Sequence, residues 1–217
     1  MQVWDYFRDN QSEVLHWLWN NAWLAALPLL LGLAIAMPLG YLAARYRWTY
    51  PPAVTIAGLL YTIPSLALFI VLPGLLGTRI LDPINVAVAL TIYTVALLVR
   101  VVADALIAVP AETRAAATAM GFTRRQLLVG VELPLAVPVI AAGLRVAAVS
   151  NVSLVSVAAI IGVPQLGQLF TAGFQNFTFA PIVLGLILVV VLALVFDGLI
   201  LAALRALTPW QRAARAR

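Results

Sequence analysis

Four ionisable side chains lie inside otherwise apolar stretches, two basic and two acidic, and they could form ion pairs. Such groups are costly in a hydrocarbon environment, so they usually pair or face water. Arg100 and Asp104 are four residues apart, which predicts a local pair on one helix face. Arg145 lies about 16 Å along a helix from Pro134, and Asp197 lies about 15 Å from the end of its own stretch. Because these depths agree, we predict that Arg145 and Asp197 pair between helices, as a structural contact or as part of a working site.

Residue types for catalysis or metal binding are scarce. The chain has no Cys and one His, His16 in a Trp-rich segment, which excludes thiolate sites and His clusters. Serines are plentiful, but no acid–base constellation accompanies them. The chain also has no Lys, so it lacks the Gly-x4-Gly-Lys-Ser/Thr segment that binds nucleotide phosphates. We therefore predict no catalytic residue, metal or cofactor in this chain.

The composition is that of an all-α integral membrane protein. Of the 217 residues, 64% are hydrophobic and 10% are charged, against about 25% charged in soluble domains. All 13 basic residues are Arg, and they gather at the edges of apolar stretches, so a nucleic acid is a poor candidate for a partner and the lipid bilayer is a good one.

Five apolar stretches predict membrane-spanning helices. The preceding residues 1–21 are amphipathic and aromatic, which predicts a helix at the membrane interface. They lack the features of a cleaved signal peptide, so the first span is expected to remain in the mature protein. Pro64 is expected to kink the second span. The spans cover 22–44, 53–72, 84–108, 135–161 and 181–207, giving a transmembrane domain over 22–207, with a loop over 162–180 and a basic tail over 208–217.

The arginines predict the orientation in the membrane. Eight arginines flank one set of span ends, whereas Arg8 and Arg79 flank the other set. Because cytoplasmic loops carry the excess of basic residues, we predict an outside N-terminus, a cytoplasmic loop over 111–134 and a cytoplasmic C-terminus. The eight are Arg45, Arg47, Arg114, Arg124, Arg125, Arg212, Arg215 and Arg217.

The loop over 111–134 is the longest polar interruption between the spans. Its Ala-rich start favours a helix, Gly121 is expected to end that helix, and Thr123 is placed to cap a second one. The loop contains Ala115-Ala116-Ala117, then Gly121 after three residues, then Val131-Glu132-Leu133-Pro134 after nine more. This spacing resembles the signature of permease subunits of binding-protein-dependent ABC importers, Glu-Ala-Ala, three residues, Gly, nine residues, Ile-x-Leu-Pro.

Two departures from that signature stand out. Ala115 replaces the glutamate, and Val131 replaces the isoleucine. Glu112, three residues earlier on roughly the same helix face, could substitute for the missing charge. The resemblance implies a cytoplasmic coupling helix that contacts a separate ATPase through Glu112, Arg114, Ala115, Ala116, Gly121, Arg124, Arg125, Leu133 and Pro134.

Further segments are similar to those of osmoprotectant permeases, which import glycine betaine, choline or carnitine. Thr62-Ile63-Pro64-Ser65-Leu66-Ala67 matches a Thr-Ile-Pro-Ser-Leu-Ala segment, and Gly162-Val163-Pro164-Gln165-Leu166-Gly167 resembles Gly-Ala-Gly-Gly-Leu-Gly. Asp197 falls where that family has an Asp in its last span. Methionine importers share the loop and the Gly-Leu-Gly element, but the first segment and Asp197 favour the osmoprotectant branch.

The resemblance implies the MetI-like fold of a type I ABC importer permease in a prokaryotic inner membrane. It further implies a second permease subunit, identical or not, two ATP-binding subunits and an extracytoplasmic substrate-binding protein. Polar residues in the spans are candidates for the translocation path, and two tyrosines could offer π-faces to a quaternary ammonium ion. Alternatively, these residues serve as contacts between helices. The candidates are Tyr61, Thr62, Pro64, Ser65, Tyr93, Ser150, Asn151 and Ser153.

Two other classes stay open at this point. An ion-coupled secondary transporter would use Asp104 or Asp197 as its coupling carboxylate, but the sequence shows no inverted repeat. An intramembrane enzyme would need a nucleophile with a base, or a metal. Copurification of an ATPase, together with ATP-dependent uptake, separates the importer permease from both.

Overall fold

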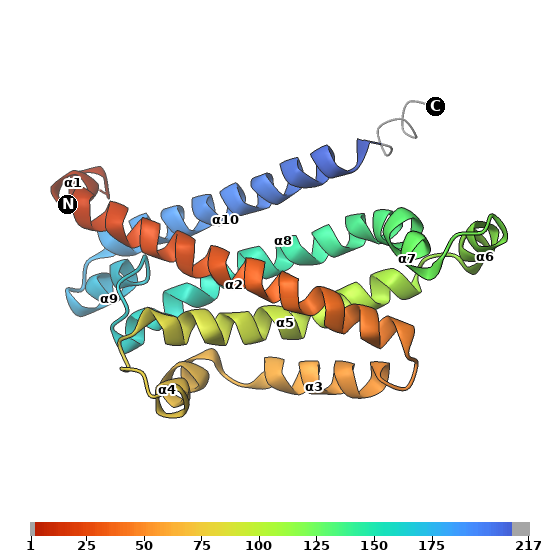
Figure 1. The fold of residues 1–217 in the computed structure, drawn as a ribbon. Coiled ribbons are helices and arrows are strands. Elements are labelled where there is room, and N and C mark those ends of the chain that lie inside the picture. Colours follow the sequence, from red (N-terminus) through yellow and green to blue (C-terminus); the bar gives the residue numbers. More distant parts are fainter. Residues whose placement is uncertain (1–2, 210–217) are drawn as a thin grey trace.

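The computed structural model describes residues 3–209, and it is an elongated bundle of helices (Figure 1). The end of the predicted basic tail, with Arg212, Arg215 and Arg217, lies outside the described residues. The helices are α1 (Val3–Asp9), α2 (Gln11–Arg45), α3 (Tyr50–Thr62), α4 (Ser65–Leu76), α5 (Pro83–Ile107), α6 (Ala111–Ala119), α7 (Arg124–Leu127), the π-helical turn η1 (Leu128–Glu132), α8 (Leu133–Val157), the 3-10 turn η2 (Ala158–Ile161), α9 (Gln168–Gln175) and α10 (Phe179–Leu207).

Four helices are long and apolar enough to cross a membrane, and the bent pair α3–α4 counts as a fifth span. The four are α2, α5, α10 and the continuous helix Arg124–Ile161, which joins α7, η1, α8 and η2. The expectation of about five transmembrane helices is therefore confirmed. The expected spans over 84–108 and 181–207 match α5 and α10 within two residues at either end.

The first long helix begins earlier than the sequence suggested. We expected an interfacial helix over 1–21 and a span from residue 22. Instead α1 ends at Asp9, and α2 runs from Gln11 without interruption to Arg45. Val14 and Asn21 are fully buried, so the amphipathic segment packs on the bundle and continues the first span.

The second span is broken rather than kinked. Helices α3 and α4 meet at an angle of 99°. Pro64 has no N–H to continue a helix, and it forces Ile63, the residue before it, into extended backbone (φ −66°, ψ 129°). The sequence predicted an interruption at residues 61–65 with a kink at Pro64, and the bend lies there, but it is sharp enough to separate two helices.

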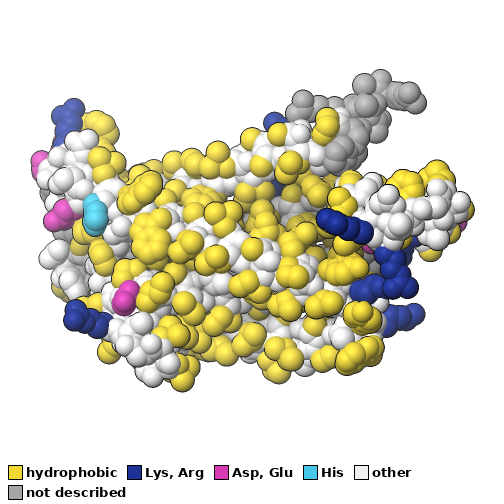
Figure 2. Space-filling view, viewed as in Figure 1, with side chains coloured by type: hydrophobic (Ala, Val, Ile, Leu, Met, Phe, Trp, Pro, Cys, Tyr) yellow, Lys and Arg dark blue, Asp and Glu magenta, His cyan; other side chains and the backbone are white. Residues whose placement is uncertain are grey.

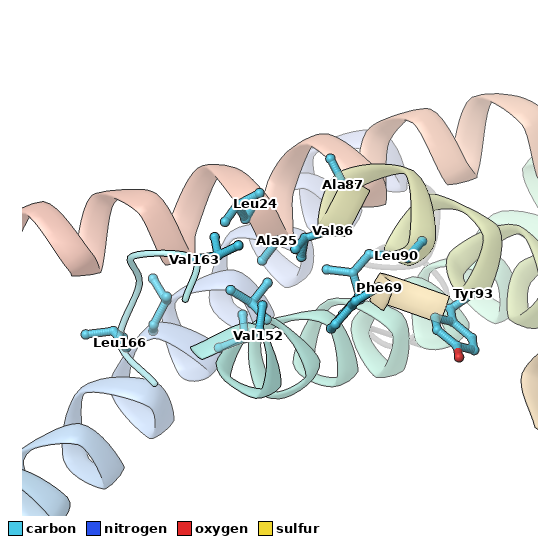
Figure 3. Close-up of a cluster of buried hydrophobic side chains, with 14 of the residues drawn as sticks. Leu24, Ala25, Phe69, Val86, Ala87, Leu90, Tyr93, Val152, Val163 and Leu166 are labelled. Atoms are coloured by element: carbon cyan, nitrogen blue, oxygen red, sulfur yellow. The ribbon is translucent and has the colours of Figure 1, made fainter. Parts of the chain in front are cut away.

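Helix α4 is fixed by the hydrophobic core at one end of the bundle. The ring of Phe69 is fully buried between side chains of α2, α5 and α8, among them Leu24, Leu90 and Val152 (Figure 3). Val163 and Leu166, which follow η2, complete this cluster. The region predicted as a loop over 162–180 therefore contributes to the core, and it contains the helix α9.

Small residues allow α2 and α5 to pack closely. A Cβ at Gly32 would lie 2.4 Å from Thr94 Cγ2, and one at Gly40 would lie 2.6 Å from Val102 Cβ. Ala36, between the two glycines, is fully buried. Spacing small residues four apart lets the backbones of membrane helices approach each other. Helix α5 also packs against α8 and α3, and α10 packs against α8, so α5 is the centre of the bundle.

Charge and apolar surface are separated along the bundle. Apolar side chains cover the middle of the molecule, and charged side chains gather at its two ends (Figure 2). Helices α1, α4 and α9 lie at one end, and α6 and α7 project from the other (Figure 1). Arg45, Arg47 and Arg114 line neighbouring cavities at the end that carries α6. An apolar belt between polar ends is the distribution that a bilayer requires.

Candidate coupling module and translocation path

The loop over 111–134 folds into a compact helical module. Helix α6 ends at Ala119, and Gly121 follows in the left-handed region at φ 84°. Thr123 then opens α7 with a capping box, in which its hydroxyl accepts from the Gln126 N–H and the Gln126 side chain accepts from the Thr123 N–H. This is the helix–glycine–helix order expected from the sequence.

Helix α6 presents one bare face to the surroundings. Glu112, Ala115, Ala116 and Ala119 are exposed, and their spacing of three and four residues puts them on one side. Ala117 is buried, which marks the side that contacts the bundle. The face that carries Ala115 in place of the signature glutamate therefore also carries Glu112.

The arginines of the module point in different directions. Arg124 and Arg125 are exposed on α7. Arg114 instead turns toward the bundle, where Nη2 donates to the Val109 carbonyl at 3.0 Å and Nη1 lies 3.8 Å from Glu132 Oε1. The sequence grouped these three arginines together, and the structure separates Arg114 from the other two.

Leu133 and Pro134 begin α8. Both are partly buried, and Leu133 packs on a cluster that includes Val102 and Leu106 of α5. The turn before them is π-helical, with the Leu133 N–H donating to the Leu128 carbonyl. Because Pro134 has no N–H, a regular α-helical ladder cannot form here.

Arg145 of α8 and Asp197 of α10 form a bidentate ion pair. Nε lies 2.5 Å from Oδ1, and Nη2 lies 2.8 Å from Oδ2. Both side chains remain partly exposed. The pair links the two helices at the depth that the sequence suggested.

Arg100 and Asp104 form the looser pair, at 3.5 Å. A third partner of this pair was not predicted from the sequence. The Tyr50 hydroxyl at the start of α3 donates to Asp104 Oδ1 at 2.5 Å, which fixes α3 to the end of α5.

Four of the eight path candidates lie together. Tyr61, Tyr93, Ser150 and Asn151 line one narrow cleft between α3, α5 and α8. The two tyrosine rings meet edge to face, with centroids 5.7 Å apart and planes at 85°. The Tyr93 hydroxyl donates to the Ile63 carbonyl at the break between α3 and α4, so this ring is fixed while the Tyr61 ring stays exposed.

The other candidates are placed differently. The Thr62 hydroxyl donates to the Leu59 carbonyl within α3, Pro64 is exposed at the break, Ser65 is half-buried, and Ser153 is exposed on α8. Asn151 is itself buried, and its Nδ2 donates to Thr94 Oγ1 at 3.0 Å and to the Ala25 carbonyl at 3.4 Å. Asn151 therefore joins α8 to α5 and α2, as polar residues between membrane helices often do.

Within residues 3–209, no group of three or more His, Cys, Asp or Glu side chains could hold a metal ion.

The chain is similar to permease components over most of its length. Residues 36–208 match the family described as binding-protein-dependent transport system inner membrane component. The osmoprotectant import permease protein OsmW of Salmonella typhimurium is 35% identical over 207 residues, covering 94% of this chain and 96% of that protein. The glycine betaine/carnitine/choline transport system permease protein OpuCD of Bacillus subtilis is 30% identical, covering 96% and 90%.

Solved structures show the same fold. A structure of the MetNI methionine ABC transporter in an inward facing conformation aligns with a TM-score of 0.79 at 21% identity, covering 92% of this chain and 98% of that chain. An amino acid ABC transporter with histidines aligns with a TM-score of 0.76 at 17% identity, covering 93% and 97%. At these identities the likeness extends to the fold alone, which is that of a MetI-like type I importer permease.

Proposed function

The chain belongs to the family of binding-protein-dependent transport system inner membrane components, and we propose that it forms the translocation path for a small osmoprotectant such as glycine betaine, choline or carnitine. Transport would be driven by ATP that a separate chain hydrolyses. The observation that carries this proposal is the module α6–Gly121–α7, which projects from the arginine-rich end of an apolar bundle.

The shape of the module suits contact with an ATPase. Its bare face consists of Glu112 and small alanines, which let another protein approach closely, and the exposed Arg124 and Arg125 extend the polar surface. In the proposed assembly, two permease subunits pair with two ATP-binding subunits that hold ATP and Mg. Each ATP-binding subunit contacts the module of one permease. An extracytoplasmic binding protein delivers the substrate to the opposite end.

The orientation in the membrane follows from the same charges. The arginine-rich end with α6 and α7 would face the cytoplasm, and the end with α1 and α9 would lie outside. An odd number of spans then puts the end of α10 on the cytoplasmic side.

The osmoprotectant class is supported by the relatives and by the tyrosine pair. OsmW and OpuCD are named for osmoprotectants and quaternary ammonium compounds, and both align over nine-tenths of this chain or more. Tyr61 and Tyr93 stand edge to face beside the break in the second span, where a quaternary ammonium ion would meet an exposed π-face. A methionine-type permease is the second candidate, because the structural neighbour MetNI shares the fold.

Reconstituted uptake tests the proposal. The permease is placed in proteoliposomes with the ATPase that copurifies with it and a binding protein, and labelled glycine betaine, choline, carnitine and methionine are offered with and without ATP. ATP-dependent uptake of the quaternary ammonium compounds is expected. ATP-dependent uptake of methionine alone would move the chain to the second candidate. Uptake driven by a proton gradient without ATP would refute an importer permease altogether.

A further inference from the structure

Arg114 is placed to hold the projecting helix α6 to the rest of the bundle. We propose that it is a positioning residue, whose guanidinium clamps α6 to the end of α5 and the start of α8. Movement that a partner imposes on α6 then reaches both spans. The inference rests on the proposed function, because it assumes that α6 receives such movement.

The clamp consists of two contacts from one side chain. Nη2 donates to the carbonyl of Val109, which lies just beyond the C-cap of α5, and Nη1 lies 3.8 Å from the Glu132 carboxylate in η1. A cation at a helix C-terminus also interacts favourably with the helix dipole. One residue of α6 is therefore joined to both of the spans that α6 connects.

Helix α6 has little else to fix its position. It has nine residues, and helices shorter than about 12 residues are marginal without tertiary contacts. Of its side chains, only Ala117 is fully buried. The apolar contact of one methyl group is weak, and α6 otherwise contacts α7 and η1 of its own module, so Arg114 is the polar side chain that ties α6 to α5.

The π-helical turn sets the direction of Glu132. A π-turn contains one residue more than an α-turn, which rotates the following side chains by about 100° around the axis. Glu132, the last residue of this turn, is 16% exposed, and together with Arg114 it lines a cavity of about 220 Å³ between α2, α5, α6 and η1. The irregular turn thus serves to bring a carboxylate under α6.

Arg45 lines the same cavity. If Arg114 is removed, the Glu132 carboxylate still has a cation nearby, so the bundle should remain folded. The expected loss is in the position of α6, and hence in the coupling of ATP hydrolysis to uptake.

The position of α6 can be measured without any partner. The sequence has no Cys, so two introduced cysteines carry spin labels at unique sites. Met120 at the end of α6 and Val139 on α8 are both exposed and suit this purpose. In the full chain in lipid nanodiscs, one narrow distance distribution is expected, and Arg114→Ala should broaden it. An unchanged distribution would overturn the clamp whatever the chain transports.

Coupling is measured in the complete reconstituted importer. Arg114→Ala and Glu132→Gln should leave the amount of copurified ATPase unchanged but lower substrate uptake per ATP hydrolysed about five- to tenfold, the range of a modest coupling energy. Arg114→Lys, which keeps a cation beside Glu132 and a donor for the Val109 carbonyl, should retain at least half of the coupling. Arg79→Ala, at the opposite end of the bundle, is the matched control and should leave both quantities unchanged.

Three results would overturn the inference. Loss of copurified ATPase in Arg114→Ala would make Arg114 a direct contact instead. Unchanged uptake per ATP in Arg114→Ala would remove its role, and unchanged uptake per ATP in Glu132→Gln would remove Glu132 as its partner. If Arg114→Ala cannot be recovered from the membrane, Arg114→Gln and Glu132→Gln provide the same comparison. Failure of the proposed function is distinct, because the unmodified importer would then show no ATP-driven uptake.

Discussion

Gly32→Ala should destabilise the bundle because α2 and α5 leave no room for a methyl group. The new Cβ would lie 2.4 Å from Thr94 Cγ2 and 2.5 Å from Thr94 Cβ. Carbon atoms in contact are about 3.5–4.0 Å apart, so the helices must separate by roughly 1 Å or Thr94 must move. A rotation of Thr94 about χ1 cannot relieve the contact with its own Cβ.

The hydrogen bonds of Thr94 oppose its displacement. Its hydroxyl donates to the Leu90 carbonyl at 2.8 Å and accepts from Asn151 Nδ2 at 3.0 Å. Overpacking costs about 1–3 kcal/mol. Loss of one interhelical hydrogen bond in a membrane adds about 0.6 kcal/mol. The intrinsic helix preference of Ala over Gly offsets about 0.5–1 kcal/mol of this. We expect a net loss of about 1–3 kcal/mol in the free energy of unfolding.

Reversible unfolding in mixed micelles, titrated with SDS, measures this difference. Gly58→Ala in α3 is the matched control, because a Cβ there meets no atom within 4 Å. It should gain up to about 1 kcal/mol from the helix preference alone. If Gly32→Ala proves as stable as Gly58→Ala, the close approach of α2 and α5 does not exist in solution, and the reasoning fails.

Variants at three further sites test the remaining features. Arg145→Asp and Asp197→Arg should each lower ATP-driven uptake, and the double variant should restore it because the bidentate pair is re-formed in reverse; absence of rescue would count against the pair. Gly121→Ala should cost about 1 kcal/mol of left-handed backbone strain and lower uptake several-fold. Gly121→Asn should retain most of the uptake, because Asn tolerates the left-handed region. Equal uptake in the two variants would contradict a backbone role for Gly121. Glu112→Ala should reduce the ATPase that copurifies with the permease relative to Glu13→Ala at the opposite end, and unchanged assembly would show that Glu112 does not replace the missing glutamate.

The sequence predicted the features that depend on composition and local backbone chemistry. The lengths of the apolar stretches located α5 and α10. The positions of Gly121 and Thr123 predicted the break between α6 and α7 and the cap of α7. The equal depths of Arg145 and Asp197 indicated a pair, because distance along a helix follows from residue number alone.

Features that depend on how helices face one another were missed. Pro64 predicted a kink, but the 99° break also needs the buried anchor that Phe69 finds between other helices. The aromatic start of α2 has the composition of an interfacial helix. Its burial was missed because the residues that cover Val14 and Asn21 come from segments distant in the sequence. Likewise, the sequence could not show that Arg114 turns inward, since the orientation of Glu132 depends on a π-turn.

The break between α3 and α4 has a consequence for water in the membrane. Helix α3 has 13 residues and is therefore about 20 Å long, whereas the hydrocarbon core is about 30 Å thick. Since α4 turns away by 99°, the end of α3 lies at membrane depth, and the first-turn N–H groups of α4 have no partner in their own helix. Lipid tails cannot satisfy such groups. This stretch of backbone must therefore stay hydrated or be covered by protein, and the exposed ring of Tyr61 lies beside it.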